Sequence, residues 1–177
     1  VKLERNWKYT ISGKTDRSLW LHVEGKVSNN ANEEEAKVII KELKQFCGWA
    51  ESQKKADNTH HDVSVLTFYK GQEKCLREKL KKLPGNENHY SRFKFKNIHI
   101  RLATVDYFQG QEADFVFLSM VRNERDGFLD SPNRLNVSIT RARYQLLIVG
   151  DRNYFLRKSS STELKKLAET LPYIEHH

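Results

Sequence analysis

The second half of the sequence contains three short apolar stretches, IHIRLATV (98–105), DFVFLSMV (114–121) and YQLLIVGD (144–151). The first half contains VSVLTF (63–68), which is of the same kind, and LWLHVEG (19–25), which alternates and ends at a glycine. Strands of a parallel sheet are buried on both faces, so they read as nearly continuous apolar runs. These stretches therefore predict the strands of a mainly parallel sheet.

Helical patterns separate the predicted strands. Asn32 is expected to cap a helix, with Glu35 at the capping-box position three residues later. Further helices are predicted to end at Pro84-Gly85, to open at Ser131-Pro132, and to cover about 161–171. Behind Asn32, apolar residues recur at helical spacing: Ala36, Ile39, Ile40, Leu43, Cys47 and Ala50.

Alternating strands and helices predict an α/β fold, and 177 residues are enough for one domain with a sizeable core. Residues 1–18 show no periodicity, and we interpret them as a linker or the tail of a preceding domain. The domain itself is expected to span 19–174, and 175–177 to be a possible tag remnant. Residues 84–97 are polar and basic, so we expect them to form a loop.

The composition excludes several classes of protein. Hydrophobic residues make up 38% and charged residues 31%, which is typical of a globular chain rather than a disordered one. No apolar run approaches the roughly 20 residues that cross a bilayer, and the first residues contain no apolar signal-peptide core. We therefore expect an intracellular protein, cytoplasmic or nuclear, without a membrane partner. The net charge of +8 favours a polyanionic partner.

Neither a disulfide nor a metal site is predicted. Cys47 and Cys75 are too far apart for a CxxC pair, so we expect two reduced core cysteines. His60 and His61 are adjacent, and two neighbouring imidazoles do not easily share one tetrahedral ion.

The segment Ser12–Thr15, SGKT, resembles the end of a phosphate-binding loop, but the GxxxxGK[ST] pattern requires glycine where this chain has Lys8. No buried strand precedes the segment, and no helical pattern follows it. We therefore interpret it as a surface turn.

A polar connection, Gln109-Gly110-Gln111-Glu112, joins two of the predicted strands. Gly110 permits close approach of a backbone or a ligand. The side chains of Gln109, Gln111 and Glu112 can hydrogen-bond ribose hydroxyls, metal-bound water or base edges. On spacing alone, a glycine turn with a capping glutamate is an equally good interpretation.

The segment RLNVSITRARYQLLIVGD (134–151) predicts a short helix with a basic edge. Arg134 and Arg141 are seven residues apart, so they would lie nearly in line, while Leu135, Ile139 and Ala142 would dock on the sheet. Two aligned guanidinium groups suit a polyphosphate, although surface salt bridges explain the same pattern.

Ligands of open α/β sheets bind beyond the carboxyl ends of the strands. That rule points to four connections, namely Thr67–Gln72, Thr104–Glu112, Arg122–Arg134 and Gly150–Asp151.

Together, TVDYFQGQEADFVFLSMVRN (104–123) and the 134–151 segment resemble motifs V and VI of superfamily 1 helicases, especially group 1B. VLTFYKGQ (65–72) resembles motif IV, with Phe68 in place of the usual proline. Asn32 and Glu35-Ala36 also fit the start of a helix in that family. The resemblance spans about residues 19–157.

The resemblance implies a three-layer RecA-like α/β/α domain, the second of two between which ATP binds. Arg141 is implied as the arginine finger on the γ-phosphate, and Glu112 as a contact to the ribose or triphosphate. Gly110 and Arg143 are implied near the nucleotide, with Arg143 and Arg134 favoured as supporting groups. The phosphate loop and the ligands of Mg²⁺ would come from the first domain, so the isolated chain is expected to be inactive.

The resemblance also implies that Thr67, Thr104 and Asp106 contact single-stranded nucleic acid. Both threonine hydroxyls can donate to phosphate, whereas Asp106 would repel phosphate unless it orients a neighbour. Tyr107 is expected to pack, or to stack on a base if it is exposed. The resulting hypothesis is an ATP-dependent helicase or translocase motor. The alternatives are a non-catalytic RecA-like module that binds nucleic acid or protein, and an unrelated nucleotide-binding domain.

Overall fold

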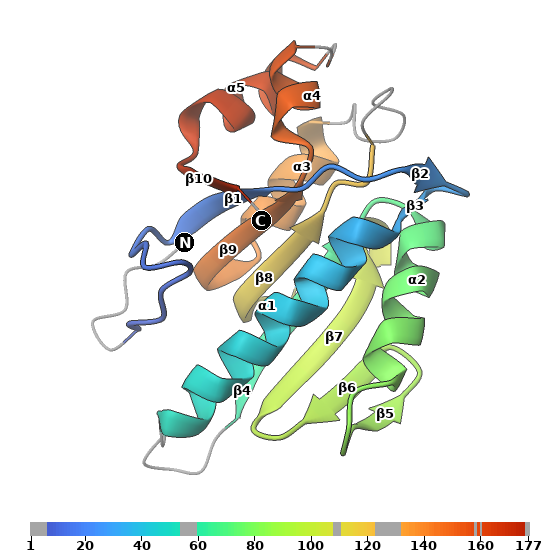
Figure 1. Ribbon diagram of the computed structural model, residues 1–177, viewed down its shortest axis with the longest axis vertical. Coiled ribbons are helices and arrows are strands. Elements are labelled where there is room, and N and C mark those ends of the chain that lie inside the picture. Colours follow the sequence, from blue (N-terminus) through green and yellow to red (C-terminus); the bar gives the residue numbers. More distant parts are fainter. Residues whose placement is uncertain are drawn as a thin grey trace.

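A computed structural model describes the fold over most of the chain (Figure 1). The described residues are 7–53, 60–107, 111–122, 132–157, 159 and 161–175. No helix among these residues is long and apolar enough to cross a membrane.

Eight strands form one sheet, in the order β10-β1-β9-β8-β4-β7-β6-β5. The sheet strands are β1 (Ser18–His22), β4 (His61–Thr67), β5 (Glu87–His89), β6 (Arg92–Phe95), β7 (Ile98–Thr104), β8 (Ala113–Ser119), β9 (Ala142–Gly150) and β10 (Tyr173–Glu175). A small separate ribbon pairs β2 (Val27–Ser28) with β3 (Ala31–Asn32). The helices are α1 (Glu33–Ser52), α2 (Lys70–Lys81), α3 (Pro132–Ile139), α4 (Arg152–Arg157) and α5 (Thr162–Thr170), with a 3₁₀ turn, η1, at Val105–Tyr107.

Every pairing from β10 to β7 is parallel. Thr67 is in register with Thr104 and with Ser119, so these strands end together at one edge of the sheet. Figure 1 shows β7 and β8 running in the same direction. The predicted parallel α/β sheet is confirmed, and it has a carboxyl edge and an amino edge.

The core consists of two layers, one on each face of the sheet. Phe115 and Phe117 of β8 point into the layer beneath α1 and α2. Val116 and Leu118 point into the opposite layer, which α3, α4 and α5 cover. All four side chains are fully buried, as expected for strands enclosed on both faces.

The start of α1 is capped as predicted, but without a capping box. Asn32 is the cap, and its side-chain oxygen accepts from the Glu35 backbone N–H at 3.2 Å. The Glu35 carboxylate turns inward instead of back to Asn32, and Oε1 accepts from Ser119 Oγ at 2.7 Å and from the Val121 N–H at 2.9 Å. The N–H of Asn32 donates to Gln72 Oε1 at 2.9 Å instead. This buried network ties α1 and α2 to the end of β8.

The loop expected over 84–97 is wrong, because this stretch contains the antiparallel hairpin β5–β6. The signal was the alternation in RFKF, where Phe93 and Phe95 are buried and Arg92 and Lys94 are exposed. Such a pattern fits an edge strand with one buried face.

Part of the stretch expected to be a linker packs on the domain. Trp7, Tyr9 and Ile11 are buried in the core, and Trp7 Nε1 donates to Gln145 Oε1 at 2.8 Å. The surface turn expected at SGKT is confirmed, because Ile11 and Lys14 pair across a turn.

Two further expectations concern the C-terminus and the cysteines. Glu175 of the expected tag remnant lies in β10, paired with His22, while 176–177 lie outside the described residues. Cys47 and Cys75 are both free thiols, as expected.

Glu35 makes the stability of the fold depend on pH. Burial raises the pKa of its carboxyl from 4.5 to about 8, despite the hydrogen bonds from Val121 and Ser119. The folded state therefore binds a proton that the unfolded state releases between these two values, so stability falls as pH rises from about 4.5 to 8. We expect Glu35→Gln to remove this fall.

The measurement is chemical denaturation at pH 5 and pH 8.5. The wild type should lose on the order of 3 kcal/mol more than the variant over that range. Glu34→Gln, an exposed neighbour, is the matched control and should behave as the wild type. Equal pH dependence in all three proteins would contradict a neutral buried carboxyl.

Candidate functional site

The residues expected to bind ligands fall on opposite edges of the sheet. Glu112 directly precedes β8 and Arg141 directly precedes β9, so both lie at the amino edge. Thr67 and Thr104 end β4 and β7 at the carboxyl edge, and Asp106 follows β7 in η1. The rule that ligands bind beyond the carboxyl ends of the strands therefore placed Glu112 at the wrong edge. Glu112 precedes β8, and all parallel strands of a sheet begin at its amino edge.

The expected alignment of Arg134 and Arg141 on one helix face is also wrong. Helix α3 ends at Ile139, and Arg141 lies in the turn that follows, where its N–H reaches the Ser138 carbonyl at 3.4 Å. The Thr140 hydroxyl donates back into the last turn of the helix. Arg134, near the start of α3, contacts Phe68 and Asp106 at the carboxyl edge, whereas Arg141 precedes β9 at the amino edge, so the two arginines lie at opposite edges of the sheet. Ala142, expected on the helix, is the buried first residue of β9.

The backbone brings Arg141 next to Glu112. The Ala113 N–H donates to the Arg141 carbonyl at 3.0 Å, and Ala113 is in register with Ala142. The Arg141 side chain is half-buried, and its Nε has no hydrogen-bond partner among the described residues. A guanidinium donor without a partner among the described residues suits an anionic ligand.

Arg143 is held by two carboxylates. Its Nη1 donates to Asp114 Oδ1 at 2.8 Å, and its Nε lies 3.6 Å from Glu112 Oε2. The Asp114 side chain is 4% exposed and also accepts the Asp62 N–H at 3.1 Å. Burial acts to lower the pKa of Arg143, but the charge and hydrogen bond of Asp114, together with Tyr144 and Glu112, outweigh burial and raise the pKa. Arg143 is thus a fixed cation beside Glu112, in keeping with the supporting role expected for it.

Glu112 lines a cavity of about 570 Å³ at the amino edge. The cavity lies against the start of β8, the first residues of β4 and β7, and the β5–β6 hairpin. Most of the residues that line it have polar side chains, including His60, Asp62, His89, Arg92, Lys94, His99, Arg101, Gln111 and Glu112.

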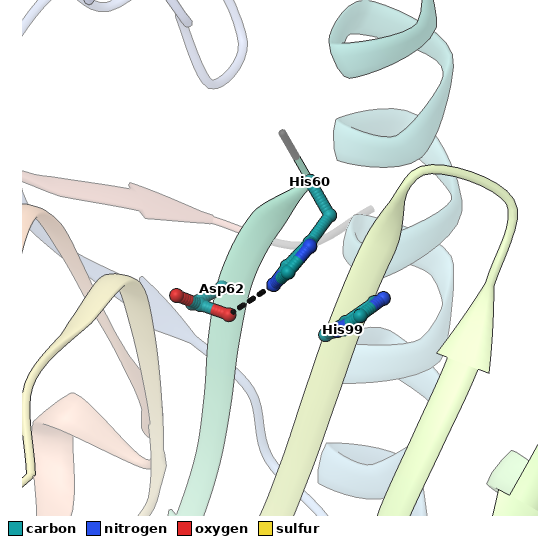
Figure 2. Close-up of side chains that lie close together, drawn as sticks. All are labelled: His60, Asp62 and His99. Atoms are coloured by element: carbon teal, nitrogen blue, oxygen red, sulfur yellow. Dashed lines mark ion pairs between the residues drawn. The ribbon is translucent and has the colours of Figure 1, made fainter. Parts of the chain in front are cut away.

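Three side chains in this cavity form a cluster that sequence reasoning missed (Figure 2). His60 Nε2 lies 3.1 Å from Asp62 Oδ1, and the rings of His60 and His99 stack at 3.4 Å with an interplanar angle of 13°. Burial and the neighbouring His60 lower the pKa of His99. The three offer ligand atoms within 4.8 Å of one another. However, the lone pairs of stacked rings run parallel instead of converging on one ion.

His61, which is adjacent to His60 in the sequence, is not part of this cluster. Alternation along β4 instead sends His61 to the other face, where it is buried and its Nδ1 lies 4.0 Å from Asp114 Oδ2. His99 comes from another strand, beside Asp62 in the register.

The threonines at the carboxyl edge are buried. Thr67 is 0% and Thr104 4% exposed. Thr67 Oγ1 accepts the Tyr69 N–H at 3.4 Å, and the Thr104 N–H donates to Glu73 Oε2 at 3.1 Å. Both threonines are therefore part of the buried packing at the end of the sheet.

Asp106 is exposed and binds Arg134 through two hydrogen bonds of 3.0 Å each. Arg134 also donates to the Phe68 carbonyl at 3.4 Å and lies over the Phe68 ring. One guanidinium thus connects the three segments that resemble motifs IV, V and VI. Gln109 and Gly110 lie outside the described residues.

Comparison with known proteins identifies the family. Residues 3–153 match the family described as an AAA domain (AAA_12). The chain belongs to this family. A regulator of nonsense transcripts 1 homolog from Neurospora crassa is 39% identical over 93 residues, which are 51% of this chain and 8% of the relative.

Two other relatives are helicases by name. One, from Schizosaccharomyces pombe, is a helicase required for RNAi-mediated heterochromatin assembly, 40% identical over 50% of this chain and 8% of its own length. The other is an uncharacterised ATP-dependent helicase of Methanocaldococcus jannaschii, 34% identical over 62% of this chain and 14% of its own length. The chain thus spans only a small part of the relatives it matches. The resemblance to superfamily 1B helicases is confirmed, and this AAA domain is of that type.

The Arg143–Asp114 pair should stabilise the amino edge. Arg143→Ala leaves the Asp114 carboxylate buried without its strongest partner, so we expect a loss of about 1–2 kcal/mol, discounted because Arg143 is one-third exposed. Asp114→Asn should make that loss smaller, giving a coupling of about 1 kcal/mol in a double-mutant cycle by urea denaturation.

Glu112→Gln is the matched control. Its carboxylate is 44% exposed and 3.6 Å from Arg143, so stability should change by less than about 0.5 kcal/mol. Additive losses for Arg143 and Asp114 would show that the pair contributes nothing of its own.

Proposed function

We propose that this chain is the second RecA-like motor domain of an ATP-dependent superfamily 1B helicase or translocase, and that Arg141 is its arginine finger. The observation that supports this most strongly is Arg141 itself: its Nε has no hydrogen-bond partner among the described residues, and its carbonyl accepts from the N–H of Ala113, the residue after Glu112, at the amino edge. The 177 residues contain no GxxxxGK[ST] segment, so the nucleotide phosphates would be bound mainly by another domain.

The residues at the amino edge suit complementary parts of a nucleotide. Arg141 offers a donor to a terminal phosphate, where a guanidinium stabilises the charge that develops during phosphoryl transfer. Glu112, held by Arg143, can accept from a ribose hydroxyl or from metal-bound water. Gly110 is proposed near the nucleotide on the resemblance alone. Mg²⁺ would be held by carboxylates of the first domain.

Helix α3 offers a route by which the two edges affect each other. Arg141 follows its last residue at the amino edge, and Arg134 near its start binds Asp106 and Phe68 at the carboxyl edge. We infer that a shift of Arg141 toward a terminal phosphate moves α3, and with it the connections after β4 and β7. Alternate closing and opening of the two motor domains would then step the protein along single-stranded nucleic acid inside the cell.

The proposal predicts that Arg141→Ala in a protein containing both motor domains lowers ATP turnover by about 10³–10⁵-fold while largely sparing ATP binding. The reason is that the guanidinium acts on charge that develops only in the transition state. Steady-state hydrolysis with saturating single-stranded nucleic acid gives the turnover, and a fluorescent ATP analogue gives the binding.

Arg157→Ala, an exposed arginine on α4, is the control and should leave turnover unchanged. Near-normal turnover after Arg141→Ala would sink the arginine-finger assignment and favour a non-catalytic binding module.

A further inference from the structure

A second groove of about 510 Å³ lies beside the carboxyl edge. It is bounded by α2, the end of β7 and the tip of the β5–β6 hairpin, and Figure 1 shows this hairpin next to β7 at one end of the sheet, near α2. The side chains of interest in its lining are Lys70, Glu73, Arg77, Tyr90, Arg101 and Tyr107.

Two tyrosines of this groove are unusually exposed. Tyr90 is 73% and Tyr107 69% exposed, the highest values for large hydrophobic side chains in the described part of the chain. Tyr90 lies at the hairpin tip and Tyr107 ends η1, so the rings come from separate elements. Large exposed aromatic rings that line one groove are typical of a binding surface.

The conformation of Tyr90 is costly. The hairpin turn consists of Tyr90 and Ser91, between the paired residues His89 and Arg92, and Tyr90 has a φ of 54°. Glycine is favoured at such a turn position, and a bulky side chain there is strained. Arg77 holds the tyrosine in place: its guanidinium lies 4.6 Å from the ring centroid, and its Nε donates to the Tyr90 carbonyl at 3.4 Å. The hairpin thus carries an aromatic ring at its tip in spite of a conformational cost.

The charges of the groove favour an anion. Lys70, Arg77 and Arg101 line it, against the single carboxylate of Glu73. That carboxylate is already engaged, because it accepts from Arg77 Nη2 at 3.0 Å and from the Thr104 N–H at 3.1 Å. Arg77 and Glu73 pair with each other, so the net positive charge of the lining comes from Lys70 and Arg101.

We propose that this groove binds single-stranded nucleic acid, with Tyr107 and Tyr90 stacking on bases and the cations contacting phosphates. Cations that follow the backbone combined with aromatic rings are the recurring features of single-strand sites, since every base offers a π-face. The groove adjoins Thr104, so it extends the track of the proposed motor onto the β5–β6 hairpin, and in this sense it rests on the proposed function. An acidic peptide would use the cations but would have little use for two exposed rings.

The test uses this chain and three labelled 12-nucleotide probes at low salt: oligo-dT, oligo-U, and an abasic strand with the same phosphates. Binding is measured by fluorescence anisotropy. Tyr90→Ala with Tyr107→Ala should weaken binding to the base-containing strands by roughly 5- to 100-fold per ring. Binding to the abasic strand should change little. The Phe variants at both positions keep the rings and should bind as the wild type.

Tyr173→Ala is the matched control, because Tyr173 is also exposed and also packs against an arginine, Arg152, but belongs to β10. It should bind all probes normally. Equal weakening for base-containing and abasic strands, or none at all, would overturn the stacking assignment. Displacement of all three probes by poly-glutamate with no preference for bases would point to an acidic peptide and overturn it too.

A second readout separates this inference from the motor proposal. In a protein with both motor domains, the Tyr90→Ala, Tyr107→Ala variant should need at least 5-fold more oligonucleotide for half-maximal ATPase stimulation, with the same rate at saturation. If the oligonucleotide concentration for half-maximal stimulation is unchanged, the groove does not bind the strand and this inference is wrong. The motor proposal still stands in that case if ATP turnover depends on Arg141.

Discussion

Parallel pairing is the constraint on which the rest of this structure depends. Because β4, β7, β8 and β9 all run in one direction, each begins at the amino edge and ends at the carboxyl edge. Glu112 and Arg141 precede strands, whereas Thr104 ends a strand and Asp106 follows one. The two pairs of residues are therefore separated by the length of the strands. A protein that uses both groups must transmit changes across the sheet, and α3 with the turn after it links Arg134, which contacts the carboxyl edge, to the start of β9 at the amino edge.

The carboxyl edge is suited to this role because buried polar contacts hold it together. Glu35 and Gln72 bind the Ser119 hydroxyl, which joins α1 and α2 to the end of β8. On the other side of the same edge, Arg134 fixes Asp106. Buried networks in which most groups are satisfied specify one arrangement of their elements. In the proposed motor, movement at the start of α3 would reach the connection after β7 through the Arg134–Asp106 contact.

Apolar runs and the Asn32 cap were enough to predict the parallel sheet and α1, because burial on two faces and capping are encoded within a few residues. The hairpin at 84–97 was predictable from the alternation in RFKF and was missed because its flanks are polar. Three features could be seen only in the three-dimensional structure. The early end of α3 separates Arg134 from Arg141, Glu35 turns inward from its cap position, and His99 joins His60 from a distant strand. Each depends on which strands are neighbours, and local patterns do not contain that information.

The central claim is that this chain completes an ATP site and does not form one alone. The most direct measurement compares ATP hydrolysis by this chain with that of a protein containing both motor domains, each with and without single-stranded DNA or RNA. We expect no appreciable hydrolysis by the chain and hydrolysis stimulated by one or both strands in the two-domain protein. Robust turnover by the chain alone, or a two-domain protein whose hydrolysis ignores nucleic acid, would contradict the account.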